Sequence, residues 1–80
     1  MYSVLDVARY VVARSNRAGT ISNLKLQKVL YFIQAEFLVV QDAPCFAEQI
    51  EAWDFGPVVP VVYYRYRTMA SAHLTGEIKS

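Results

Sequence analysis

One long apolar stretch, from Ser22 to Asp42, decides most of what this chain can fold into. Its large apolar side chains recur at steps of four and three positions, which places them along one face of an α-helix. These residues are Leu26, Leu30, Ile33, Phe37 and Val40. Ser22 is a favoured N-cap residue, and Ile21 before it can pack on Leu26 inside the helix. The spacing therefore predicts a central helix over residues 22–42.

A second row of apolar side chains lies on the same stretch. Leu24, Tyr31 and Leu38 form this row, and they widen the apolar face beyond what one neighbouring helix can cover. We therefore expect the central helix to be packed on more than one side.

Two further helices are expected, one on each side of the central one. Residues 3–18 carry valines and an alanine on one side and charged side chains on the other, which predicts an amphipathic helix. Residues 58–70 are rich in valine and tyrosine, which favours a strand. However, Pro60 is disfavoured in a central strand and suits the first turn of a helix, and Val58 and Val62 fall at helical spacing. We therefore predict a third helix over residues 58–70.

The segment between the second and third helices is expected to be irregular or briefly extended. A proline at position 44 stops the central helix, because the residue before a proline is pushed out of the helical region. Residues 50–55 then alternate in a pattern that permits a short extended stretch. The predicted fold class is therefore mostly all-α, with three helices and one irregular or short extended connection in a single small domain.

Composition and charge limit the partners and the cellular location that we expect for such a domain. Eleven of the 80 residues are aromatic, which is more than the core of a small domain can readily bury. We therefore expect some rings to be exposed at the surface. They either contact a partner, including a second copy of the chain, or leave only their edges in solvent. The net charge of +1 provides no strong field toward nucleic acid or anionic lipid. The start of the chain lacks the pattern of a signal peptide, and no long apolar run occurs. We expect a cytoplasmic protein without a membrane segment.

The residues offer no convincing pattern for catalysis. His73 is the single histidine and follows the last periodic segment, and Cys45 is the single cysteine, so neither an internal disulfide nor a cysteine-pair metal site can form. No base near Cys45 in the sequence would lower the pKa of its thiol. The acids Glu48, Glu51 and Asp54 read as solvated side chains. We expect no enzymatic activity, no metal site and no cofactor.

DNA binding is an alternative that the residues themselves support in part. Two helices joined by a short turn loosely match a helix-turn-helix arrangement. The polar residues that open the second helix are Asn23, Lys25, Gln27 and Lys28. The rest of that helix is too apolar to lie exposed in a DNA groove, so a buried helix with a polar first turn is the plainer account. A small DNA-binding domain and a phage-associated structural or scaffold protein both stay open as alternatives.

Two sequence motifs carry a resemblance to a known family. Residues 26–32 read LQKVLYF, and residues 50–63 read IEAWDFGPVVPVVY. With Ser22 as the helix cap, this chain resembles the Panacea-domain family, also called SocA-like antitoxins or phage-associated proteins. Members typically show a leucine-glutamine-lysine-leucine-leucine-tyrosine helix followed by an alanine-tryptophan and glycine-proline-valine block. The chain has these parts in the same order, over roughly residues 4–66.

The resemblance implies a mostly helical, non-catalytic domain that neutralises a toxin encoded beside it by binding that toxin directly. Some members also hand their toxin to a protease, which would be a further partner. Family members often carry an acidic residue after the second proline, where this chain has Val61, which puts a polar contact there in question. The family domain usually continues with further helices, so it stays open whether residues 1–80 are a complete domain or one truncated at its C-terminus.

Candidate contact residues gather at the Gly-Pro turn and on the central helix. Tryptophan and tyrosine are the side chains most often found at binding hot spots, although the same rings can instead lock the turn onto the central helix. Lys28 and Tyr31 lie three positions apart and share a side of the helix. The predicted partner-binding residues are Lys28, Tyr31, Trp53, Phe55, Gly56, Pro57, Tyr63, Tyr64 and Arg65.

Overall fold

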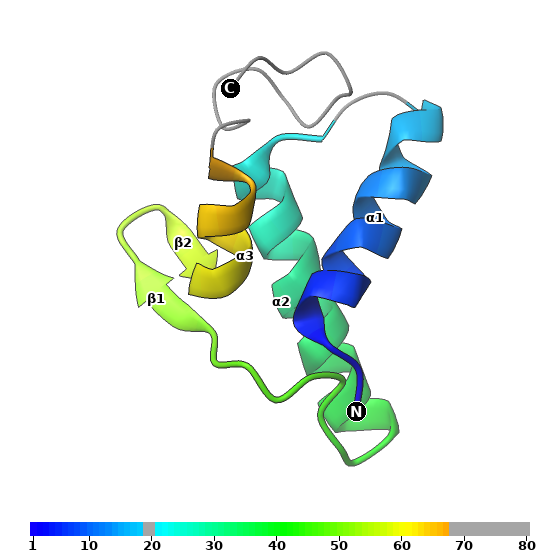
Figure 1. Cartoon of the computed structure of the whole chain (residues 1–80). Helices are drawn as coiled ribbons and strands as arrows, with labels where there is room; N and C mark the ends of the chain where they lie inside the picture. Colours follow the sequence, from blue (N-terminus) through cyan, green and yellow to red (C-terminus); the bar gives the residue numbers. More distant parts are fainter. Residues whose placement is uncertain (19–20, 68–80) are drawn as a thin grey trace.

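The computed structural model describes residues 1–18 and 21–67 and shows helices and a two-stranded hairpin in the order α1, α2, β1, β2, α3 (Figure 1). The helices are α1 (Val4–Ala18), α2 (Asn23–Val40) and α3 (Pro60–Arg65), and the strands are β1 (Glu51–Trp53) and β2 (Gly56–Val58). The strands pair antiparallel, with Glu51 opposite Val58 and Trp53 opposite Gly56. The mostly helical prediction agrees with this fold, and the short extended connection is a β-hairpin.

The core lies where α1, α2 and α3 meet the loop that precedes the hairpin. Ser22 caps α2 as predicted, because its Oγ accepts a hydrogen bond of 3.1 Å from the backbone N–H of Lys25. Ile21 and Leu26 on either side of this cap are both buried. The buried apolar cluster consists of Val4, Ala8, Val11, Ile21, Leu26, Leu30, Cys45, Phe46, Val59 and Val62.

The second apolar row of α2 is not covered. Leu24, Tyr31 and Leu38 are 46%, 44% and 50% exposed. Three elements pack on α2, namely α1, α3 and β2. The central helix is therefore packed on more than one side, as predicted, but this packing leaves the second apolar row about half exposed.

The central helix also ends two residues earlier than predicted. The backbone N–H of Gln41 donates a hydrogen bond of 2.8 Å to the carbonyl of Phe37, and Asp42 then adopts a left-handed conformation with φ of 55°. This conformation breaks the helical path before Pro44 is reached.

The third helix is shorter than predicted. Val58 belongs to β2 and Val59 is the extended N-cap residue, so α3 begins at Pro60 rather than at residue 58. Pro60 occupies the first turn as expected, since its fixed φ suits a helix start. The helix ends at Arg65, and the predicted helical residues 68–70 lie outside the described residues, as does His73. Among the described residues, no helix could span a membrane.

Candidate partner-binding site

Four aromatic rings from the hairpin and α3 pack against one another at the surface. The ring centroid of Trp53 lies 5.1 Å from that of Tyr63 and 5.8 Å from that of Phe55, and Tyr63 and Tyr64 are 5.5 Å apart. These three contacts have edge-to-face geometry, which aromatic pairs favour. We call these four residues the ring cluster.

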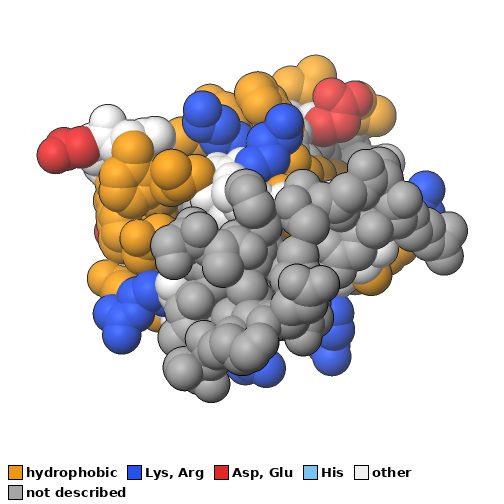
Figure 2. All heavy atoms as spheres, turned by 90° about the horizontal axis from the view of Figure 1, so that it is seen from above, with side chains coloured by type: hydrophobic (Ala, Val, Ile, Leu, Met, Phe, Trp, Pro, Cys, Tyr) orange, Lys and Arg blue, Asp and Glu red, His pale blue; other side chains and the backbone are white. Residues whose placement is uncertain are grey.

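The ring cluster is open to solvent on one side. Phe55 is 45% exposed and Tyr64 is 55% exposed, whereas Trp53 and Tyr63 are half-buried. None of the four belongs to the buried core. Seen from above, hydrophobic side chains form the edge of the molecule on the hairpin side (Figure 2). The rings thus form an apolar surface patch rather than a buried packing contact between the turn and α2.

The turn of the hairpin depends on glycine. Gly56 has φ of 130°, a backbone conformation that residues with a Cβ rarely adopt. Pro57 follows it and pairs with Ala52 across the hairpin. The Cε atom of Lys28 would lie 3.8 Å from a Cβ built on Gly56, so the lysine stem runs alongside the turn. The structure therefore brings Lys28, Gly56 and Pro57 next to the ring cluster.

Two buried amides on α2 hold β2 and α3 in place. The Oε1 atom of Gln27 accepts a hydrogen bond of 2.9 Å from the backbone N–H of Val59, and its Nε2 donates one of 2.9 Å to Oδ1 of Asn23. The Nδ2 of Asn23 then donates to the carbonyl of Tyr63 at 3.1 Å. This network fixes the backbone at both ends of the segment from Val59 to Tyr63.

A third amide on α2 holds the loop before the hairpin. Gln34 accepts hydrogen bonds at Oε1 from the backbone N–H groups of Cys45 and Phe46, at 2.7 and 3.3 Å, and donates from Nε2 to the carbonyl of Phe46 at 2.8 Å. The backbone N–H of Tyr2 donates to the carbonyl of Cys45 at 2.7 Å, which ties the start of the chain to the same loop. Sequence reasoning missed all three amides as structural anchors.

Two predicted contact residues lie apart from the ring cluster. Tyr31 makes an edge contact with Phe32 on the outer side of α2, with ring centroids 5.6 Å apart. Arg65 is exposed but lines a shallow depression with Arg9 of α1. Sequence reasoning also missed Arg67, whose guanidinium carbon lies 5.7 Å from the ring centroid of Tyr64 and adds a cation to the edge of the cluster.

The polar residues that suggested DNA binding do not form one surface. Asn23 is 0% exposed and Gln27 is 1% exposed, so neither side chain can reach a phosphate or a base edge. Lys25 and Lys28 are exposed. The buried amides support the plainer account of a buried helix with a polar first turn.

A cleft, an ion pair and one buried thiol are the features of the described residues that bear on chemistry. A cleft of about 490 Å³ lies between α1 and α2, and its walls are almost wholly apolar. Asp6 at its edge forms an ion pair with Arg9, and burial raises the pKa of the Cys45 thiol. Within residues 1–18 and 21–67, no three His, Cys, Asp or Glu side chains come together in a way that could hold a metal ion.

Comparison with known proteins bears on the same motifs. The family model described as "Antitoxin SocA-like, Panacea domain" matches residues 26–79, which is more than half of the chain. The chain belongs to this SocA-like Panacea family. The match includes the whole ring cluster together with Gln27 and Gln34.

A curated relative adds sequence identity over a shorter stretch. Antitoxin SocA of Caulobacter vibrioides (strain NA1000 / CB15N) is 58% identical to this chain over 43 residues, which are 54% of the chain and 23% of the relative. The matched part of this Panacea chain therefore spans less than a quarter of the relative's length. No solved structure matches the chain.

Proposed function

We infer that this domain is a non-enzymatic, protein-binding module of the antitoxin type, which binds a toxin protein directly through the ring cluster. Membership of the SocA-like Panacea family supports the antitoxin role. The observation that carries the proposal is the position of Trp53, Phe55, Tyr63 and Tyr64, which pack on one another outside the core and stay partly exposed.

The physical argument rests on what exposed rings do at an interface. Such rings bury much apolar surface on contact and lose little conformational entropy, which is why tryptophan and tyrosine dominate binding hot spots. The cluster is already held in shape by its mutual contacts and by the Asn23–Gln27 network, so binding requires little reordering. Lys28 beside Gly56 and Arg67 over Tyr64 add cations at its edge, which suits a partner surface that carries acidic groups.

The test uses a matched pair of tyrosines. Tyr64 lies under Arg67 in the ring cluster, and Tyr10 lies under Arg14 on α1, with the guanidinium carbon 5.4 Å from the ring centroid. Both tyrosines are exposed to a similar degree. The probe is the protein encoded by the neighbouring gene, co-expressed in a growth assay and titrated against the purified chain by calorimetry.

We expect Tyr64→Ala to weaken binding by roughly 30-fold or more and to abolish rescue of growth, because a hot-spot ring contributes about 2 kcal/mol or more. Tyr10→Ala should leave both readouts unchanged. Equal effects of the two substitutions would show that the ring cluster is not part of the toxin interface. Tight binding of the chain to the DNA upstream of its own gene, with a steep salt dependence and without a protein partner, would favour the DNA-binding alternative instead.

A further inference from the structure

The outer side of α2 carries an apolar seam that nothing in the described chain covers. Its apolar residues recur every seven positions, which is the heptad repeat of a coiled-coil helix. The larger apolar members are about half exposed, and Phe32 and Val39 beside them are exposed as well. The seam consists of Leu24, Tyr31 and Leu38.

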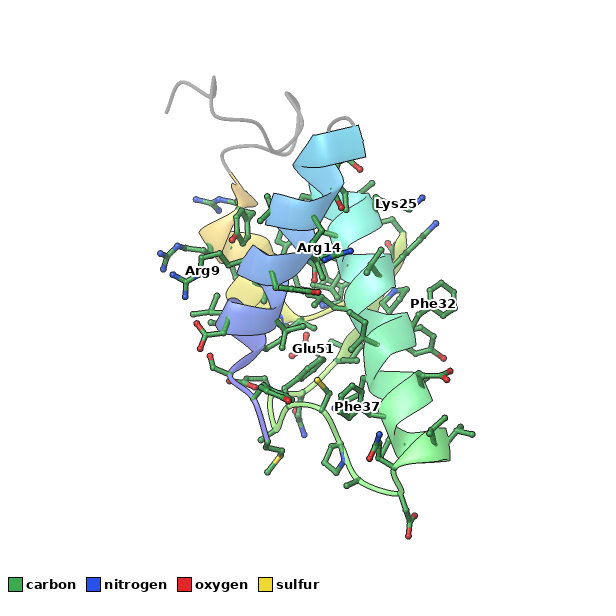
Figure 3. All side chains as sticks on the ribbon, turned by 90° about the vertical axis from the view of Figure 1, so that its right-hand side faces the viewer. Arg9, Arg14, Lys25, Phe32, Phe37 and Glu51 are labelled. Carbon is green, nitrogen blue, oxygen red and sulfur yellow. The ribbon has the colours of Figure 1, made fainter. Side chains whose placement is uncertain are left out.

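This seam is open to solvent along its length, since Leu24, Tyr31 and Leu38 are each about half exposed. Figure 3 shows Lys25 and Phe32 pointing outward from the side of α2 that lies away from α1, whereas Phe37 points inward. The seam therefore runs along the length of the helix as a ridge that a second helix can approach. Monomeric soluble proteins rarely leave such a contiguous apolar strip uncovered.

The seam is symmetric about Tyr31, because Leu24 and Leu38 lie seven positions before and after it. An antiparallel copy centred on Tyr31 places Leu24 opposite the second copy's Leu38 and sets the two Tyr31 rings against each other.

The flanking charges agree with the same register. Lys25 and Glu36 lie eleven positions apart, about three helical turns, and so occupy one flank of the seam. A two-fold axis near Tyr31 brings Lys25 of each copy beside Glu36 of the other. A parallel pairing would instead place like charges side by side, which is unfavourable.

We propose that two copies of this chain associate through antiparallel α2 helices, with the Leu24–Leu38 seam at the centre and two Lys25–Glu36 ion pairs at its flank. The contact is small, because α2 has 18 residues and so measures about 27 Å. Interfaces of this size fall below the roughly 1,200 Å² of stable complexes, so the dimer is weak and reversible. Self-association through this surface is independent of the ring cluster and of any toxin.

The test is sedimentation equilibrium of the full chain from micromolar to millimolar concentration. The wild-type mass should rise toward twice the monomer mass. Lys25→Glu or Glu36→Lys alone should weaken the dimer about tenfold, because symmetry makes each reversal act twice. The double reversal Lys25→Glu with Glu36→Lys should restore the affinity to within about threefold of wild type.

The controls separate this surface from others. Glu48→Lys makes the same charge change in the exposed loop before the hairpin and should leave dimerisation unchanged. Leu38→Ser should abolish the dimer while circular dichroism shows unchanged helix content. A chain that stays monomeric throughout overturns the proposal. A dimer whose affinity does not change on charge reversal overturns it too. The same holds if the seam becomes protected from solvent only when a toxin protein is added.

Discussion

Oε1 of Gln27, in the middle of the LQK motif, accepts a hydrogen bond from the backbone N–H of Val59, 32 residues further along the chain, at 2.9 Å. Both groups are buried. The bond joins the central helix to the point where β2 ends and α3 begins.

Replacing Gln27 with leucine keeps the side-chain volume and removes both of its hydrogen bonds. The N–H of Val59 and the Oδ1 of Asn23 would then be buried without a partner. We expect Gln27→Leu to lower the free energy of unfolding by roughly 1–3 kcal/mol, measured by urea denaturation. Gln49→Leu, at an exposed position, should change it by about 0.5 kcal/mol or less. Equal losses at the two positions would contradict a structural role for the Gln27 network.

Gly56 supplies a second prediction, because its φ of 130° is strained for any residue with a side chain. Gly56→Ala should destabilise the fold by roughly 1–3 kcal/mol. The added Cβ would meet only the flexible end of Lys28, at an ordinary contact distance of 3.8 Å, so the loss arises from the backbone. Adding Lys28→Ala to Gly56→Ala should therefore fail to recover stability in thermal unfolding. Recovery in the double variant would point to a steric cause.

Asp42 supplies a third prediction at the end of α2. Its φ of 55° lies in the left-handed region, where glycine has no penalty and a branched side chain has a large one. We expect Asp42→Gly to raise the free energy of unfolding by roughly 0.5–1 kcal/mol and Asp42→Val to lower it by a similar amount or more. Calorimetric melting of the three chains checks this order, and a Val variant as stable as the Gly variant would contradict it.

The buried thiol of Cys45 predicts a pH dependence. Burial raises the pKa of this thiol above its ordinary value of 9.0, and the nearby N-terminal ammonium opposes the shift. The folded chain therefore holds the thiol proton more tightly than the unfolded chain does. The resulting stabilisation is fully present below about pH 9 and is lost as the pH rises through the folded value.

Cys45→Ala is the matched control for that dependence. Unfolding free energies measured between pH 7 and pH 10 should fall more steeply for the wild type than for the variant, although the variant is less stable overall because it loses packing. Parallel pH profiles for the two chains would show that burial does not shift the thiol.

The sequence predicted features that depend on near neighbours in the chain. The Ser22 cap, the burial of Leu26 and Leu30 and the place of Pro60 in the first turn of a helix each follow from spacing or from the properties of one residue. The sequence did not predict where the hairpin ends and α3 begins. Val58 lies at helical spacing from Val62, although it belongs to β2 and pairs with Glu51. Each strand has three residues, too few for alternation to separate strand from helix.

Other features depended on contacts between distant segments. Periodicity showed that Leu24, Tyr31 and Leu38 share a face of α2, but it could not show whether another element covers that face. The buried amides were missed because polar residues were read as exposed. A signal was present, since Asn23, Gln27 and Gln34 recur at helical spacing next to buried Leu30.

For the candidate site, the sequence identified the rings but not their arrangement. It predicted both Tyr64 and Arg65 as contact residues, but Arg65 lies in a depression with Arg9, because successive residues of a helix point in different directions. It could not show that Trp53 and Tyr63 meet, since that contact depends on how β1 and α3 pack together.

The bonds from α2 to the ring-bearing segment end on main-chain atoms, the N–H of Val59 and the carbonyl of Tyr63. Every residue type has a carbonyl, and all but proline have an N–H, so these attachments survive a change of side chain at either position. The rings can therefore be exchanged for others while the scaffold that presents them keeps its shape. On the function proposed for the ring cluster, a frame of this kind allows new binding specificities to arise by substitution within a few positions of the hairpin and α3.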